Sequence, residues 1–221
     1  MSGWLALVGG AEWSDDCRGF DAQLLEASGG TEVLVLPTAA AYEHPDRAVA
    51  HAAEYFEALG GRATGLDVLR RPDAEQADNA HAVRSARFVY LAGGSPLHLR
   101  SVLKDSAVWR ALTEAWEDGA VVAGSSAGAM VLGEPMVDPR GGAFTLGLGL
   151  VTSLAVIAHA NSWSAETRHR TAQLAPKGVP MVAIDEATAA LRAPDGTWTT
   201  AGAGAVAVSC DGVECPLSQL P

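Results

Sequence analysis

Short apolar segments alternate with amphipathic stretches through the first 130 residues, and this alternation is the feature that most constrains the fold. Several of the apolar runs stop at glycine or proline, as at Gly9-Gly10, Pro37 and Gly93-Gly94. Between them, apolar residues recur at helical spacing. The pattern predicts an α/β fold of three layers, in which helices cover both faces of a mostly parallel sheet. Ligands bind such sheets beyond the carboxyl ends of the strands.

The pattern assigns most of the chain to elements. We expect strands at Trp4 to Val8, Val33 to Leu36, Leu66 to Leu69, Phe88 to Leu91, Val121 to Gly124, Leu154 to Ala158 and Val179 to Ile184. We expect helices after Ser14, from Pro45 to Leu59, from Asp73 to Ala86, after Pro96, around Val108 to Trp116 and from Ala165 to Ala175. Gly133 to Gly149 is expected to be a loop, and the segments at Thr188 to Ala193, Trp198 and Ala205 to Ser209 to be antiparallel. The length of 221 residues suits one domain, residues 1–221.

Composition excludes several classes of function. The net charge of −11 opposes the phosphate contacts on which nucleic-acid binding depends. The N-terminus lacks a basic leader, and no apolar run is long enough for a membrane span, so we expect a cytoplasmic protein without a membrane partner. Cys17, Cys210 and Cys215 do not have the spacing of a zinc site or of a disulfide framework, and we expect no metal. No nucleotide-binding loop is present, and we expect no cofactor. Both a monomer and a homodimer stay open.

A five-residue motif carries the first sign of chemistry. Gly124-Ser125-Ser126-Ala127-Gly128 satisfies G-x-S-x-G, the pattern of a strand that turns sharply into a helix and exposes a serine at the corner. Ser126 is therefore a candidate nucleophile. The backbone N–H of Ala127, which opens the helix, could stabilise an oxyanion. Packing of small residues in a chain rich in glycine and alanine could produce the same pattern without catalysis.

Two further polar residues follow expected strands. His159 comes after Leu154 to Ala158, and Glu186 follows Val179 to Ile184 with one residue between. If these strands are parallel neighbours of the strand before Ser126, the three side chains meet at one edge as nucleophile, base and orienting acid. Asp138 is the alternative acid. The backbone N–H of Gly94, at another strand end, is the expected second oxyanion donor.

Several separate motifs together resemble one family over nearly the whole chain. They are Leu7-Val8-Gly9-Gly10, Val35-Leu36-Pro37-Thr38-Ala39, Ala92-Gly93-Gly94, Gly124 to Ala129, Gly147-Leu148-Gly149-Leu150 and Ile184 to Ala189. In order and spacing they are similar to the serine peptidases that include aspartyl dipeptidase E and cyanophycinase, with the cyanophycinase-like branch nearer. The resemblance implies a fold like that of class I glutamine amidotransferases, which is flavodoxin-like.

The resemblance also implies an activity. Ser126 matches the family nucleophile, His159 its base and Glu186 a glutamate implicated as the third member, which implies a serine-type peptidase that forms an acyl-enzyme on a small peptide or isopeptide. Gly93, Ser95 and Asn161 fall around the substrate pocket. The family has Asp-Gln where this chain has Ser95-Pro96, and again just before the histidine, and these differences argue against cyanophycin itself as substrate. Arg168 and Arg170 could receive a substrate carboxylate, although a solvated helix face explains them better.

Two other functions compete with this one. A catalytically silent member of the same fold could bind a ligand or regulate another protein, and its Ser126 would lie more than about 5 Å from His159. An α/β-hydrolase esterase shares G-x-S-x-G but has its histidine near the C-terminus, and no histidine follows His169 here.

Overall fold

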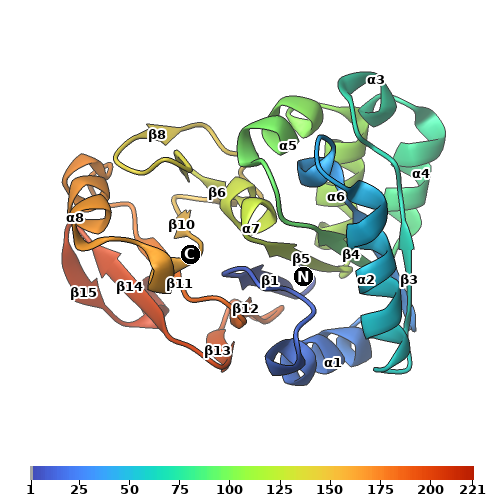
Figure 1. Cartoon of the computed structure of the whole chain (residues 1–221), viewed down its shortest axis with the longest axis horizontal. Coiled ribbons are helices and arrows are strands. Elements are labelled where there is room, and N and C mark those ends of the chain that lie inside the picture. Colours follow the sequence, from blue (N-terminus) through green and yellow to red (C-terminus); the bar gives the residue numbers. More distant parts are fainter. Residues whose placement is uncertain (1) are drawn as a thin grey trace.

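A seven-stranded sheet forms the centre of the molecule, seen in a computed structural model that describes residues 2–221 (Figure 1). Its strands are β1 (Leu5–Val8), β2 (Glu32–Leu36), β3 (Arg62–Gly65), β4 (Phe88–Leu91), β5 (Val121–Ser125), β12 (Thr188–Arg192) and β13 (Trp198–Gly202), in the order β13-β12-β1-β5-β4-β2-β3. The five strands from β1 to β3 in this order are parallel, and β12 and β13 are antiparallel to their neighbours. The expected mostly parallel sheet is confirmed.

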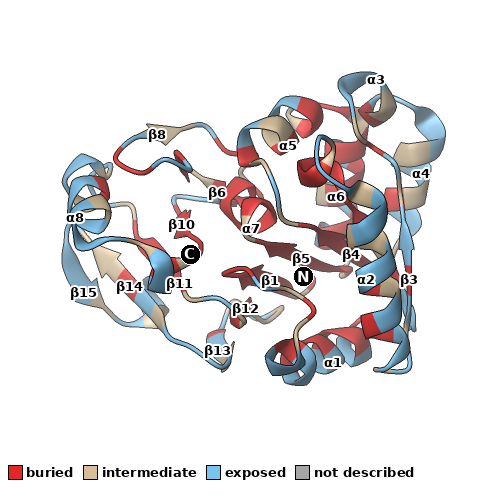
Figure 2. Ribbon diagram, viewed as in Figure 1, coloured by how far each residue is buried: buried red, intermediate tan, exposed pale blue. Residues whose placement is uncertain are grey.

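Helices cover both faces of this sheet. One face carries α1 (Arg18–Ala27) and α2 (Pro45–Glu57), and the other carries α3 (Arg71–Ala74), α4 (Ala77–Ser85), α5 (Pro96–Leu103), α6 (Ala107–Glu117) and α7 (Ala127–Leu132). Strand β1 shows the division, because its side chains alternate between two hydrophobic cores. Ala6 and Val8 pack in the core beneath α1 and α2, and Leu5 and Leu7 pack in the core on the opposite face. Figure 2 shows the buried central strands and the exposed outer surfaces of α2 and α4. The three-layer fold is confirmed.

The C-terminal third contains a second sheet that the sequence did not reveal. Strands β10 (Ala155–Ile157), β11 (Met181–Ile184), β14 (Val206–Cys210) and β15 (Val213–Cys215) pair in that order, with β10 and β11 parallel. The strands before His159 and Glu186 are therefore not neighbours of β5, because β1 and β4 already pair with both edges of β5. Helix α8 (Ala165–Leu174) lies with this second sheet (Figure 1).

Smaller elements fill the connections. The span expected as a loop contains β6 (Gly133–Glu134), β7 (Met136–Val137) and β8 (Phe144–Thr145), and β9 (Val151–Thr152) pairs with β6. Single 3-10 turns lie at Asp15–Cys17, Thr38–Ala40, Ala160–Ser162 and Leu217–Gln219. Within residues 2–221, no helix has the length and apolar character needed to cross a bilayer.

Two expected elements differ in the structure. The strand expected at Leu66 to Leu69 lies earlier, at β3, where Arg62 pairs with Glu32 across the strands and the two side chains form an ion pair of 2.9 Å. Val68 is fully buried, but it follows the strand. The helix expected from Asp73 to Ala86 is divided into α3 and α4, because the backbone of Gln76 is extended.

Candidate active site

A strained turn carries Ser126 between β5 and α7. Its backbone has φ 50° and ψ −110°, a conformation that a residue with a side chain rarely adopts. The Ser126 N–H donates to Val8 O at 2.9 Å, and its carbonyl accepts from Met130 N–H at 3.0 Å, so both sides of the turn are fixed. A Cβ on Gly128 would lie 2.3 Å from Leu91 O, so only glycine lets α7 approach β4 this closely. This is the strand, turn and helix expected from G-x-S-x-G.

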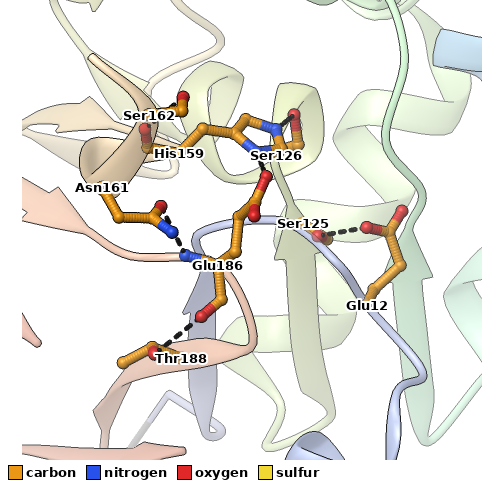
Figure 3. A network of polar contacts seen from close by, with 8 residues as sticks. All are labelled: Glu12, Ser125, Ser126, His159, Asn161, Ser162, Glu186 and Thr188. Atoms are coloured by element: carbon orange, nitrogen blue, oxygen red, sulfur yellow. Dashed lines mark hydrogen bonds and ion pairs between the residues drawn. The ribbon is translucent and has the colours of Figure 1, made fainter. Parts of the chain in front are cut away.

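The structure brings Ser126, His159 and Glu186 into one hydrogen-bonded chain (Figure 3). The Oγ of Ser126 lies 2.8 Å from Nε2 of His159. On the other side of the ring, Nδ1 lies 2.8 Å from Oε1 of Glu186. His159 follows β10 in a left-handed conformation, and Glu186 follows β11. A histidine bonded in this way can accept the serine proton while the carboxylate orients the ring.

The carboxyl end of β1 joins the two sheets at this point. Three main-chain groups there each bind a different part of the site. Ser126 N–H donates to Val8 O at 2.9 Å, His159 N–H to Gly9 O at 2.7 Å and Ala187 N–H to Gly10 O at 2.8 Å. The three polar side chains therefore meet although the strands that precede them belong to two sheets and are not neighbours within one sheet.

A cavity of about 350 Å³ opens beside Ser126. The described residues that line it are Glu12, Ala40, Glu43, His44, Ala48, Gly93, Gly94, Ser126 and His159. Ala127 is the first residue of α7, so its N–H has no partner within the helix. The Gly94 N–H donates to no acceptor among residues 2–221. Two backbone donors without a partner in residues 2–221 therefore lie in the segments around Ser126.

Two residues expected in the substrate pocket have other contacts. The Ser95 Oγ accepts from His98 N–H at 3.3 Å and caps α5. The Asn161 Oδ1 accepts from Glu186 N–H at 3.2 Å, so this side chain holds the segment that carries the acid. Gly93 does line the cavity, but its N–H donates to Glu12 Oε1 at 2.9 Å.

Asp138, the alternative acid, is paired with Arg140. Its carboxylate accepts from the guanidinium at 2.9 and 2.7 Å, and these bonds lower the pKa of Asp138 to about 2. The structure therefore brings Glu186, and not Asp138, to the imidazole. Arg168 donates to Trp163 O at 2.8 Å, and Arg170 lines a separate cavity with Arg140, so neither arginine is at Ser126.

Glu12 belongs to the site and was missed in the sequence. Its Oε2 accepts from the Ser125 hydroxyl at 2.7 Å (Figure 3), and its Oε1 accepts from Gly93 N–H. The available signal was position, since Glu12 follows Gly9-Gly10 at the carboxyl end of β1, where ligands bind. In the described part of the chain, no three His, Cys, Asp or Glu side chains are arranged to hold a metal ion.

Comparison with known proteins identifies the family. Residues 5–198 match the sequence profile of peptidase family S51. The chain belongs to peptidase family S51. It is therefore a member of a family of hydrolases that cleave peptides, as the motifs implied.

Cyanophycinases are among the relatives of this S51 peptidase. That of Synechococcus elongatus is 27% identical over 217 residues, which cover 93% of this chain and 67% of the relative. The cyanophycinase of Trichormus variabilis is 26% identical over 213 residues, which cover 91% of this chain and 72% of the relative.

Solved structures agree with this placement. A peptidase from an acI-B1 Actinobacterium is 28% identical, with a TM-score of 0.85 over 97% of this chain and 93% of that chain. A putative peptidase E protein from Listeria monocytogenes, 19% identical, shares the fold with a TM-score of 0.70, over 92% of this chain and 100% of that chain.

Proposed function

We propose that this S51 peptidase is a serine-type enzyme that cleaves the amide bond of a small peptide or isopeptide through an acyl-enzyme on Ser126. One observation carries the proposal. The hydroxyl of Ser126, the imidazole of His159 and the carboxylate of Glu186 form a continuous chain with two contacts of 2.8 Å. The distance between Oγ of Ser126 and Nε2 of His159 is well below the separation of about 5 Å that we expect in a catalytically silent member of the fold.

Each group has a defined task in this mechanism. Nε2 of His159 takes the hydroxyl proton, and Oγ of Ser126 attacks the carbonyl carbon. Glu186 accepts a hydrogen bond from Nδ1–H, which fixes the tautomer and stabilises the imidazolium that forms. The imidazolium then gives its proton to the leaving amine, and water hydrolyses the acyl-enzyme by the same steps.

The negative oxygen of the tetrahedral intermediate needs donors that are already in position. The N–H groups of Gly94 and Ala127 are suited to this task, because neither donates to an acceptor among residues 2–221. The loss of one such donor typically costs about 3 kcal/mol of transition-state stabilisation.

The substrate is inferred from the cavity and from the relatives. A volume of about 350 Å³ suits a small ligand rather than a folded protein. The curated relatives are named cyanophycinases, but Ser95-Pro96 and Ile157-Ala158 stand where the family pattern has Asp-Gln. We therefore infer a small peptide or isopeptide other than cyanophycin.

A fluorophosphonate probe tests the nucleophile. We expect the wild type to be labelled once per chain and Ser126→Ala to be unlabelled while it keeps its thermal stability. Ser85→Ala, at the exposed end of α4, is the matched control and should be labelled like wild type. Equal labelling of wild type and Ser126→Ala would reject the proposal.

A further inference from the structure

We propose that Glu12 is a positioning residue that holds the Gly93-Gly94 turn so that the Gly94 N–H points toward the carbonyl that Ser126 attacks. The inference rests on the proposed serine mechanism and deepens it. Glu12 does not contact the serine hydroxyl or the imidazole in the structure, so its role is exerted through the main chain of the turn.

The Glu12 carboxylate ties together two strand ends. Its Oε1 accepts from the N–H of Gly93, which follows β4, at 2.9 Å. Its Oε2 accepts from the hydroxyl of Ser125, the last residue of β5, at 2.7 Å. Both contacts are charge-assisted, and such bonds are about twice as strong as those between neutral groups. One side chain therefore fixes the turn relative to the residue that precedes the nucleophile.

The turn is also held on its other side. The Ser95 N–H donates to Ala39 O at 2.8 Å. The N–H groups of Gly93 and Ser95 are both occupied, but the N–H between them, that of Gly94, has no acceptor within residues 2–221. Gly94 lines the same cavity as Ser126. Backbone donors in proteins almost always find a partner, and a substrate oxyanion would supply the missing one.

The fit around the carboxylate leaves little room for movement. A Cβ built on Gly93 would lie 2.8 Å from Oε1 of Glu12 and 3.5 Å from Cβ of Ser126. The carboxylate, the turn and the nucleophile are thus close neighbours. A small withdrawal of the acceptor would release Gly93 and let the Gly94 peptide rotate away from the reacting carbonyl.

Three variants of Glu12 separate position from charge. Glu12→Ala removes both contacts. Glu12→Asp keeps the charge but shortens the side chain by one methylene, so the carboxylate no longer reaches Gly93. Glu12→Gln loses the charge but keeps the length, an oxygen acceptor for Gly93 N–H and an amide that can donate to the Ser125 hydroxyl. Glu26→Ala, on the exposed side of α1, is the matched control for the loss of a carboxylate.

The measurement is the second-order rate of inactivation by a fluorophosphonate, whose phosphoryl oxygen occupies the position of the oxyanion, together with the melting temperature of each variant. We expect Glu12→Ala and Glu12→Asp to react about 100-fold more slowly than wild type. Glu12→Gln is expected to restore the rate to within about fivefold, and Glu26→Ala to leave it unchanged. Should Glu12→Ala fail to fold, the contrast between Asp and Gln decides the question.

The opposite pattern overturns the proposal. If Glu12→Asp reacts like wild type, the reach of the carboxylate does not matter. If Glu12→Gln is as slow as Glu12→Asp, an oxygen acceptor at the right distance is not enough to hold the turn, and the charge is needed as well. If the wild type is not labelled at all, the serine mechanism fails and the role of Glu12 fails with it. If the wild type is labelled at Ser126 and Glu12→Ala reacts equally fast, only the Glu12 proposal is rejected.

Discussion

The backbone of Gly10 lies directly against the imidazole of His159, so that a Cβ on Gly10 would be 2.2 Å from Cε1 of the ring. Gly10 also has φ +123°, a conformation that L residues with a side chain rarely adopt. Gly9-Gly10 ends β1, as the sequence indicated, but in the structure it also leaves the space in which the base lies.

A methyl group at Gly10 should therefore displace the base. We expect Gly10→Ala to reduce the rate of fluorophosphonate labelling by at least about 100-fold, because the ring cannot keep its bond to Ser126. The positive φ should cost about 1–3 kcal/mol in the free energy of unfolding. The control is Gly19→Ala in α1, where a Cβ meets no atom within 4 Å. Similar labelling by both variants would contradict this view of Gly10.

The identity of the triad acid can be tested with two variants. We expect Glu186→Gln to lower kcat by about 10²–10⁴-fold, because the amide no longer stabilises the imidazolium. The side chain is 44% exposed, so we expect the lower half of that range. Asp138→Asn removes only the partner of Arg140 and should leave kcat within about threefold of wild type. A larger effect at Asp138 than at Glu186 would reverse the assignment.

Burial of Asp21 should make stability depend on pH. The carboxyl is buried beneath α1 and accepts a hydrogen bond from the Tyr55 hydroxyl at 3.0 Å. Burial, with a smaller contribution from the charge of Glu12, raises the pKa of Asp21 to about 7. Between about pH 4 and 7 the unfolded chain loses this proton before the folded chain does, so the free energy of unfolding falls as pH rises.

Asp21→Asn should remove this decrease in the free energy of unfolding between about pH 4 and 7. The amide does not ionise and can still accept from Tyr55, so the variant should be more stable than wild type at pH 8 by a few kcal/mol, and nearly equal at pH 4. Urea unfolding of both proteins across this range checks the expectation. Parallel curves for the two proteins would show that Asp21 does not titrate in this window.

Cys210 and Cys215 should form a disulfide under oxidising conditions. They are free thiols on the antiparallel pair β14 and β15, and their sulfur atoms are 2.9 Å apart. The hydrogen bond with Cys210 raises the pKa of Cys215 to about 11, so Cys215 is rarely a thiolate at neutral pH. Oxidised glutathione should convert the two protein thiols into a disulfide and should itself be reduced to two thiols. We expect this exchange to be faster at higher pH, where more of the thiols are ionised.

Cys17 serves as the internal comparison for that experiment. It is buried, and burial raises the pKa of its thiol. Mass spectrometry after oxidation and alkylation should find Cys17 unmodified in the native protein, while Cys210→Ser blocks the internal disulfide. A wild type in which only mixed disulfides form would contradict the expected pairing.

The charge of the cavity predicts a preference among substrates. Glu12 and Glu43 line it, and no Lys or Arg side chain of residues 2–221 does. A carboxylate near the scissile bond would therefore be repelled. In a dipeptide and isopeptide library assayed with wild type and Ser126→Ala, we expect neutral and cationic residues beside the cleaved bond to be favoured over aspartate, by roughly tenfold or less because Glu43 is exposed. Preferential cleavage beside aspartate would contradict this.

Much of the fold could be predicted because its signals are local. The apolar runs of β1, β2, β4 and β5 and the helical spacing of α2 and α6 are properties of short segments. The turn at Ser126 has an equally local signal in its five-residue motif, although Gly128 is required by its close approach to Leu91 in β4. The end of β3 was harder to locate, because this edge strand has exposed side chains and the buried Val68 lies beyond it.

The rest depends on contacts between segments far apart in sequence. The second sheet arises because β14 pairs with β11, and the sequence does not specify which strand a given apolar run will join. The link between Glu12 and Ser125 spans 113 positions, and neither residue belongs to a recognisable motif with the other. The structure nevertheless brings together Ser126, His159 and Glu186, which the sequence singled out because each follows a strand. The role of each residue stays a prediction.

Ser126 follows a strand of the large sheet, His159 follows a strand of the small sheet, and Glu186 lies in the connection between the two, so the three side chains meet only when the molecule is assembled as a whole. A chain whose large sheet and helices persist, but whose small sheet has shifted by the length of a single bond, would look native by circular dichroism and yet be inert. Loss of turnover is therefore a finer gauge of tertiary order in this protein than any measure of its helix content.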